Sequence, residues 1–274
     1  MVFESLINPI KAEKKPWEMF FIGIIYTSAA VILSLYIFRD YASLVMIFLT
    51  VLPSVPLMYS AIKMEEKKDL VFEQERILIK EHGKVAAFFA FLFLGMVVSF
   101  ALWYVFLPAE TVSLLFNTQI NEITQIEEIS SGATGHAVNL YSNFTDIFLN
   151  NILVLILVLI FAFLYGIGGM FILTWNAAIM GAAVGIFIKN SIDSYLISIP
   201  FALLRYSIHG IPEMVAYFTA GLAGSIISIA IIRHDFGTEK FKRVLIDSID
   251  LILLSFIILF ISALLEIFVT PLLF

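Results

Sequence analysis

The chain has 274 residues, of which 61% carry hydrophobic side chains and only 14% are charged, and its mean hydropathy is +1.01. Soluble domains contain roughly 25% charged residues, so a large core does not explain this deficit and the sequence predicts a polytopic membrane protein. The net charge of −6 offers no basic surface for nucleic acid, and the lack of cysteine excludes disulfides, iron–sulfur clusters and thiol chemistry.

Seven apolar runs, each near the ~20 residues that a bilayer requires, predict an all-α transmembrane helical bundle that forms one domain over residues 1–274. They are Trp17–Phe38, Tyr41–Ile62, Val85–Leu107, Ile147–Tyr165, Met170–Ile188, Glu213–Ile232 and Ile249–Val269. If these spans alternate in direction, 13 of the 16 Lys and Arg residues fall on one side. This bias predicts a multi-pass protein of the cell membrane with a cytoplasmic N-terminus and an external C-terminus.

Two connections between the spans carry most of the polar sequence. Residues 63–84 hold six cations and six anions with apolar residues at near-helical spacing, which predicts either a cytoplasmic amphipathic helix or solvated extensions of the neighbouring spans. Residues 108–145 contain no Lys or Arg and are predicted to form an external acidic loop. Within this loop the spacing of Val112, Phe116, Ile120 and Ile123 predicts a short helix that lies on the outer leaflet or on a partner.

The segment Tyr195–Ile232 is too long for one span and too short for two spans with a turn. Residues 195–212 are therefore predicted to form a re-entrant half-helix that ends in a helix break. The break is assigned to Gly210 and Pro212, because glycine loosens a helix and proline is accepted at the first position of a new one. Such irregular backbone is tolerated at membrane depth only inside the protein.

Three polar residues accompany this predicted break. Arg205, His209 and Glu213 are four residues apart, which aligns them on one helical face if the break is small. Because a charge at membrane depth costs about 2.5–3.5 kcal/mol, an ion pair between Arg205 and Glu213 is expected. The cluster is either a proton, ion or substrate site or a structural clamp, and the clamp is favoured. Asp250 and Glu266 are interpreted as helix-end carboxylates that reach interfacial water.

Small and amide residues indicate close helix packing in the fourth, fifth and sixth spans. Gly181-xxx-Gly185 and the region of Gly221 and Gly224 place small residues at the spacing that lets helix backbones approach. An asparagine is expected to bond across these helices. The packing residues predicted in this way are Asn150, Asn151, Asn176, Gly181, Gly185, Gly221 and Gly224. The glycines mediate either an intramolecular bundle, which is favoured, or a homo-oligomer.

These same elements carry a family resemblance. They are Asn150-Asn151, the Gly166-x-Gly168-Gly169 turn, Asn176 with Gly181 and Gly185, and His209-Gly210-x-Pro212-Glu213 followed by Gly221 and Gly224. Together they resemble the stage II sporulation protein M family of integral membrane proteins, over roughly Asn150–His234. The resemblance implies a membrane scaffold that works with peptidoglycan-degrading partners in sporulating bacteria, and it implies no defined activity for members outside sporulation.

The favoured function is a non-enzymatic scaffold or partner-recruiting component in cell-envelope or membrane remodelling. The acidic loop and the resemblance support it, with membrane lipid around the spans and a protein partner at the loop or at residues 63–84. The alternative is a transporter or channel component whose polar site surrounds His209 and Glu213. No cofactor, catalytic residue or metal site is expected, because only His209 of the four histidines lies at membrane depth and zinc sites need several ligands.

Overall fold

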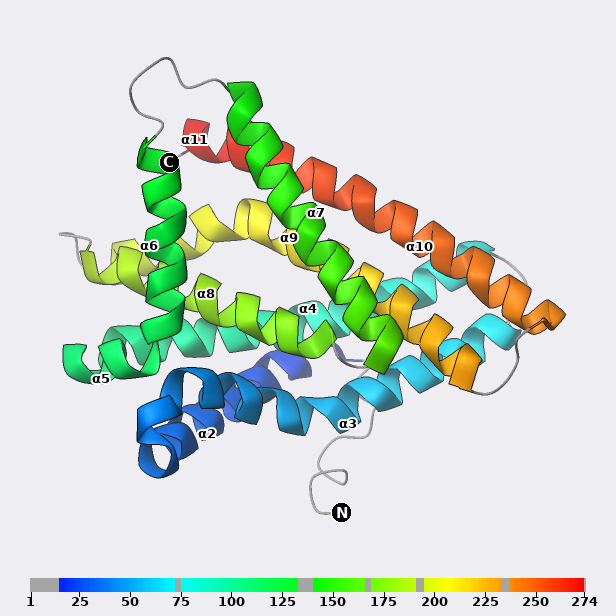
Figure 1. Ribbon diagram of the computed structural model, residues 1–274, viewed down its shortest axis with the longest axis horizontal. Coiled ribbons are helices and arrows are strands. Elements are labelled where there is room, and N and C mark those ends of the chain that lie inside the picture. Colours follow the sequence, from blue (N-terminus) through cyan, green and yellow to red (C-terminus); the bar gives the residue numbers. More distant parts are fainter. Residues whose placement is uncertain are drawn as a thin grey trace.

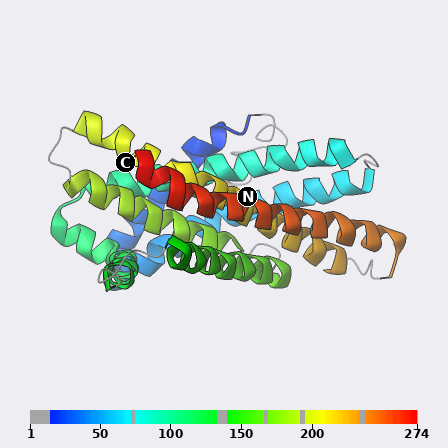
Figure 2. The same ribbon diagram turned by 90° about the horizontal axis from the view of Figure 1, so that it is seen from above.

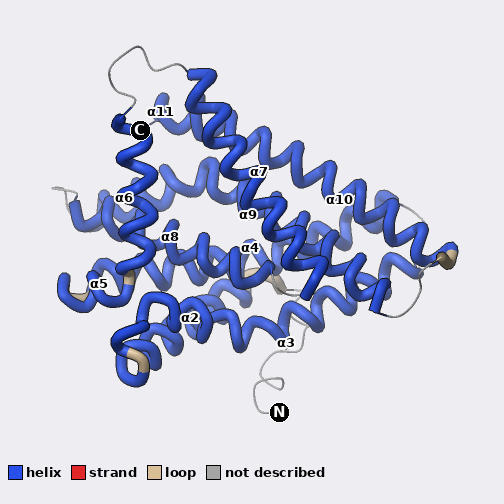
Figure 3. The backbone as a smooth tube through the Cα atoms, viewed as in Figure 1, coloured by secondary structure: helices blue, strands red, loops and turns tan. Residues whose placement is uncertain are grey.

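The computed structural model of the chain describes residues 15–71, 75–132, 140–165, 169–190, 195–232 and 237–273. Every regular element in these ranges is a helix (Figure 1), and Figure 3 shows only short loops between them. In chain order the elements are α2 (Glu18–Ile37), η1 (Arg39–Tyr41), α3 (Ala42–Val71), α4 (Glu75–Phe106), α5 (Ala109–Leu115), α6 (Asn117–Gly132), α7 (Leu140–Tyr165), α8 (Gly169–Asn190), α9 (Tyr195–Ile232), α10 (Glu239–Leu264), η2 (Leu265–Val269) and α11 (Thr270–Leu273). The predicted all-α class is confirmed.

Seven of these helices contain a stretch that is long and apolar enough to cross a membrane. The stretches are Glu18–Ile37, Arg39–Ala61, Gly83–Phe106, Phe144–Leu164, Gly169–Asn190, Leu204–Ile232 and Phe241–Leu273. In hydrocarbon every backbone N–H and C=O must be satisfied within the protein, and a helix does this with its own hydrogen bonds. The chain is therefore a multi-pass membrane protein, as its composition predicts.

The spans pack around two central helices, α4 and α9. Helix α4 packs against α2 and α8, whereas α9 packs against α7 and α10. The spans run roughly along the long axis of the molecule, and α7 crosses them obliquely (Figure 1). Seen from above in Figure 2, the bundle is several helices deep, and α8 and α9 run side by side in opposite directions.

The highly charged connection between the second and third spans continues the helices that flank it. Helix α3 extends to Val71 and α4 begins at Glu75, so residues 63–71 and 75–84 belong to these two helices, and residues 72–74 lie outside the described part of the chain. A helix in water satisfies its backbone as well as one in lipid does, so nothing in the backbone requires it to stop at the membrane surface. The predicted cytoplasmic location of this segment stays a prediction.

The predicted external loop is largely helical, and we call α5 and α6 together the helical cap. Phe116 is fully buried against Phe100 and Tyr104 of α4, with ring centroids 6.3 and 5.2 Å apart. The expectation that Phe116 faces lipid or a partner is therefore wrong. The cap lies across the spans rather than parallel to them. Its apolar residues therefore form the side that packs on the bundle. In Figure 2, α6 is seen nearly end-on while the spans run across the picture.

A polar contact fastens the cap to the start of α3. Ser43 donates a hydrogen bond of 2.9 Å to the Oε1 atom of Gln119, and it also contacts the hydroxyl of Thr118. The backbone N–H of Thr118 donates to the same serine hydroxyl. Gln119 is fully buried although it is a polar residue. Its Oε1 atom thus has a donor at the junction of the cap with α3, whereas its buried Nε2 atom has no hydrogen-bond partner among the described residues.

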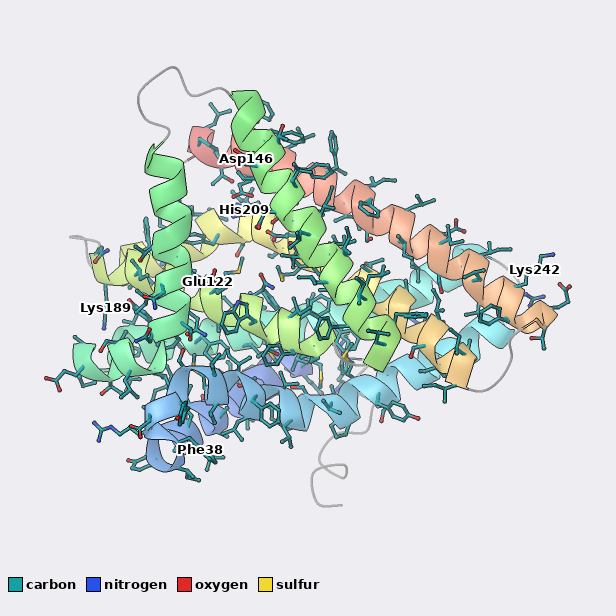
Figure 4. The ribbon with its side chains drawn as sticks, viewed as in Figure 1. Phe38, Glu122, Asp146, Lys189, His209 and Lys242 are labelled. Carbon is teal, nitrogen blue, oxygen red and sulfur yellow. The ribbon has the colours of Figure 1, made fainter. Side chains whose placement is uncertain are left out.

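Two exposed lysines lie at the two ends of the bundle. Figure 4 places Lys189, at the end of α8, and Lys242, near the start of α10, at opposite ends of the molecule. The ammonium group of Lys189 donates to the carbonyl of Leu107 at 3.2 Å and lies 5.3 Å from the ring centre of Tyr104. This lysine therefore joins the end of α8 to the end of α4 on the side that carries the cap.

Candidate functional site

A row of polar side chains joins α9 to the C-terminal helices, and we call it the polar seam. Its residues are His209, Glu213 and Tyr217 of α9 and Ser262, Glu266 and Thr270 of α10, η2 and α11. In each set the residues are four positions apart, which places them on one face of their helix. The two faces meet because α9 and α10 pack against each other along the bundle. In Figure 4, His209 lies in the interior of the bundle, where α9 nears the C-terminus.

Three hydrogen bonds hold the polar seam together. The Nδ1 atom of His209 and the hydroxyl of Thr270 lie 3.3 Å apart, and the hydroxyl of Ser262 donates to the backbone carbonyl of His209 at 2.6 Å. The hydroxyl of the fully buried Tyr217 donates to the Oε1 atom of Glu213 at 2.8 Å. Glu266 lies in η2, which also packs against α9.

The helix break predicted at Gly210 and Pro212 is wrong, because α9 is one continuous helix from Tyr195 to Ile232. At 1.5 Å per residue its 38 residues extend about 57 Å, so the excess length appears as a longer helix rather than as a chain reversal. The re-entrant half-helix is therefore not formed. Instead α9 is bent in the region of His209 (Figures 1 and 4), as expected for a helix with an internal proline.

The polar seam explains how this proline is accommodated. Pro212 has no N–H group, so the carbonyl of Ile208, four residues earlier, loses its helical donor. The next carbonyl, that of His209, receives the hydroxyl of Ser262 from the neighbouring helix. Serine and threonine side chains from adjacent helices commonly support the backbone around a proline in membrane proteins. Ser262 thus stabilises the bend from outside α9.

The predicted cluster of Arg205, His209 and Glu213 is divided in the structure. Arg205 and Glu213 are eight residues apart on a continuous helix, a rise of about 12 Å. Within the part of the chain that the structure describes, these two residues form no ion pair, and the guanidinium group of Arg205 lies 5.6 Å from the ring centre of Phe187. The expected pairing is therefore wrong. The partner of Glu213 is Tyr217, one turn further along α9.

The sequence interpretation missed half of the polar seam. Glu266 was expected to reach interfacial water, whereas it is partly buried in η2, which packs against α9. Element η2 is a π-helix. Helices of this type are rare in proteins, and many of those that occur lie at functional sites. The repeating four-residue spacing of Ser262, Glu266 and Thr270 is visible in the sequence and could have marked them as one polar face.

The polar seam brings together an imidazole, two carboxyl groups and a phenol inside a bundle of spans. These are groups that accept, release or relay protons, and ionisable residues within spans commonly have functional roles. Among the described residues there is no group of three or more His, Asp or Glu side chains with the geometry to hold a metal ion. The arrangement is suited to proton binding or to a conformational contact between α9 and the C-terminal helices.

The predicted packing glycines lie at close contacts between helices, although not all at the expected ones. A Cβ atom on Gly181 would lie 2.6 Å from the Cβ of Phe100, and one on Gly185 would lie 2.6 Å from the ring of Tyr104, so both glycines face α4 of the third span. In contrast Gly224 lies against Leu159 and Ala162 of α7, and Gly221 contacts Val158 there.

The predicted asparagines divide in their surroundings. Asn151 is buried and Asn150 is exposed, both in α7. Asn176 donates to the carbonyl of Ile172 at 2.8 Å, within its own helix. The bond across helices that was expected for an asparagine is therefore not made by Asn176, because a carbonyl one turn earlier lies within reach.

The closest helix contacts of the bundle involve two glycines that the sequence interpretation did not select. A Cβ atom on Gly95 of α4 would overlap the backbone carbonyl of Phe20 in α2, and one on Gly23 of α2 would overlap the carbonyl of Leu92 in α4. The backbones of α2 and α4 therefore touch. Because Gly23 and Gly95 belong to different helices, no spacing within one segment reveals them.

The comparisons with known proteins agree with the fold and with the resemblance noted above. Residues 85–271, more than half of the chain, match the family model described as stage II sporulation protein M. The match includes α4 from residue 85 onward, the helical cap, both faces of the polar seam and all the predicted packing residues. Neither the curated proteins nor the solved structures gave a match. The chain belongs to the stage II sporulation protein M family of integral membrane proteins.

Proposed function

We propose that the protein is a non-enzymatic membrane scaffold that recruits a protein partner at the helical cap, in cell-envelope or membrane remodelling. The observation that carries this proposal is the asymmetry of the cap. Its inner side is fixed to the bundle through buried Phe116 and Gln119, whereas Glu110, Asn121 and Glu122 are exposed on its outer side. A surface fixed in this way loses little conformational entropy when a partner binds.

The chemistry of the cap indicates what kind of partner fits it. Residues 108–145 contain four glutamates and no Lys or Arg, so this segment carries a net negative charge. Electrostatic complementarity favours a partner with a basic surface. Family membership supports a role in the cell envelope, and the predicted external location of the cap fits a partner on that side of the membrane.

The test is charge reversal on the exposed side of the cap. Glu110→Lys together with Glu122→Lys should greatly reduce the amount of partner that co-purifies from native membranes, with unchanged thermal stability of the protein. Glu239→Lys, which reverses an exposed carboxylate at the start of α10, is the matched control and should leave co-purification intact. Equal recovery of partners with the cap variant and the control would contradict the proposal.

The polar seam favours a second candidate function, a transport or channel component. Glu213 and Glu266 belong to the two packed faces of the polar seam, and ionisable groups at such positions commonly bind protons or ions. Flux of protons or monovalent cations in proteoliposomes tests this function directly. Flux that is abolished by Glu266→Gln would favour transport over the scaffold. The absence of flux in vesicles that contain the protein would count against transport.

A further inference from the structure

A second feature of the bundle is an apolar cavity between α4, α8 and α9, which we call the apolar groove. Its volume is about 530 Å³, and it lies on the side of α9 that carries Gly210 and Met214 rather than on the polar seam. Small residues form its α4 wall, since Gly83, Ala87 and Ala90 all line it. A Cβ atom on Gly83 would have no other atom within 4 Å, so this end of the groove is open.

The apolar groove opens toward the surrounding lipid. Phe91 and Ile211 line it and are both exposed, so they lie at its rim. The segments that form it, Gly83–Phe106 and Leu204–Ile232, are both membrane spans. Apart from Tyr206 and Ser207, its lining side chains are apolar. Hydrocarbon is therefore the medium that meets the groove, and water would find few hydrogen-bonding partners in it.

The dimensions of the groove separate a lipid chain from a helix. The α4 residues that line it extend from Gly83 to Val97, about 21 Å along the helix. A helix of that length, about 10–12 Å across with its side chains, occupies a cylinder of roughly 1,600–2,400 Å³, which is more than the groove can hold. A hydrocarbon chain is much narrower, and the length of the groove exceeds the ~15 Å depth of one leaflet, half of the hydrocarbon core.

The charge at the mouth of the groove indicates the type of lipid. Gly83 is the first residue of its span, and the exposed Lys84 follows it directly. Lys242, near the start of α10, is also exposed and lies at the end of the bundle where α4 begins (Figures 1 and 4). Basic residues beside a membrane attract anionic headgroups. We propose that the apolar groove binds one acyl chain of an anionic phospholipid, whose headgroup lies at the Gly83 and Lys84 end.

The proposal predicts that filling the groove displaces the lipid. In Ala90→Phe a ring occupies the space of the acyl chain, and Ala29→Phe, the same change at an exposed position of α2, is the matched control. The full-length protein in detergent is titrated with palmitoyl-oleoyl phosphatidylglycerol, and binding is followed by native mass spectrometry and by the rise in Tm. We expect affinity at least about tenfold weaker for Ala90→Phe, and unchanged affinity for Ala29→Phe. Equal affinities would overturn the proposal.

A second variant and two further measurements also test the proposal. Gly83→Leu fills the open end of the groove without a clash, so it replaces Ala90→Phe if that variant does not fold. Palmitoyl-oleoyl phosphatidylcholine has the same acyl chains and a neutral headgroup, so it should bind more weakly, and Lys84→Gln should reduce the difference between the two lipids. A photo-crosslinker in place of Phe91 should label lipid in membranes. Labelling of a protein instead would overturn the assignment to an acyl chain.

Discussion

Two interfaces of the bundle, that of α2 with α4 and that of α9 with α10, differ in their closest contacts. Between α2 and α4, glycines remove side chains so that backbones touch, as at Gly95 against Phe20. Between α9 and α10, a polar side chain reaches a backbone carbonyl, as between Ser262 and His209. In lipid the hydrophobic effect does not drive helices together, and close packing and hydrogen bonding are the two remaining sources of affinity. The α4 contacts should therefore be sensitive to added volume, and the polar seam to lost partners.

The largest effect is expected at the contact between α2 and α4. Gly95→Ala places a methyl group into the backbone of Phe20, and the helices must separate to admit it, at a cost of about 3 kcal/mol. Gly83→Ala in the same helix is the control, because its Cβ meets no neighbouring atom and alanine favours a helix by about 0.5–1 kcal/mol. Thermal unfolding in detergent measures both. Similar stability of the two variants would mean that α2 and α4 do not touch as described.

A smaller effect is expected in the polar seam, where Tyr217→Phe leaves the Glu213 carboxylate without its donor. The expected loss is about 1–3 kcal/mol. In a double-mutant cycle, Tyr217→Phe and Glu213→Gln should couple, because the two groups share a hydrogen bond of 2.8 Å.

The matched cycle uses Arg205→Met with Glu213→Gln. Its effects should add to within about 0.5 kcal/mol, since these residues lie two turns apart and share no contact. Coupling in this second cycle, with none in the first, would restore the ion pair that the sequence predicts and contradict the seam as described. Unfolding midpoints of the single and double variants supply the data.

A third prediction concerns the support of the bend in α9. Ser262→Ala removes the donor to the His209 carbonyl and should lower stability by about 1 kcal/mol. Ser255→Ala is the control, because Ser255 is equally buried but donates to Ile252 within its own helix. The control should change stability by less than about 0.5 kcal/mol, since the bond of Ser255 joins no second helix. A larger loss for Ser255→Ala than for Ser262→Ala would contradict the role assigned to Ser262.

The last prediction has no effect on stability and distinguishes the two ends of the bundle. The chain has no cysteine, so Ser113→Cys on the cap and Lys242→Cys at the start of α10 each introduce one reactive thiol at an exposed position. A membrane-impermeant maleimide should label position 113 in intact cells and position 242 only after permeabilisation. Labelling of both positions from the same side would refute the orientation predicted from the cations.

The sequence predicts the spans well and the contacts between them less well. Apolar runs near 20 residues mark a span by themselves, because the bilayer sets their length. The break at Pro212 was wrong because proline removes one donor, and the hydroxyl that supports the bend comes from Ser262, 50 residues later in the chain. Phe116 was misplaced for a similar reason, since apolar spacing shows that one face of a helix is covered but not what covers it.

The sequence predicted the α9 side of the candidate site and missed the C-terminal side, again because the contacts between segments are not visible in it. His209 and Glu213 stand out because ionisable residues within a long apolar segment are rare. Glu266 lies near the end of the last span, where a carboxylate usually needs no partner. Only the packing of α10 on α9 brings it to the polar seam, and no pattern within either segment contains that contact.

The π-helix makes the C-terminal end of the chain tolerant of a change in length at one point. A π turn holds about one residue more than an α turn, as if a single codon had been inserted into a regular helix. Deleting one residue between Leu265 and Val269 would restore a regular α turn and leave the residues that follow on nearly the same face of the helix. The same deletion in the regular part of α10 would rotate everything that follows by about 100°, and Thr270 would turn away from His209. An in-frame deletion should therefore be accepted in η2 more readily than in α10.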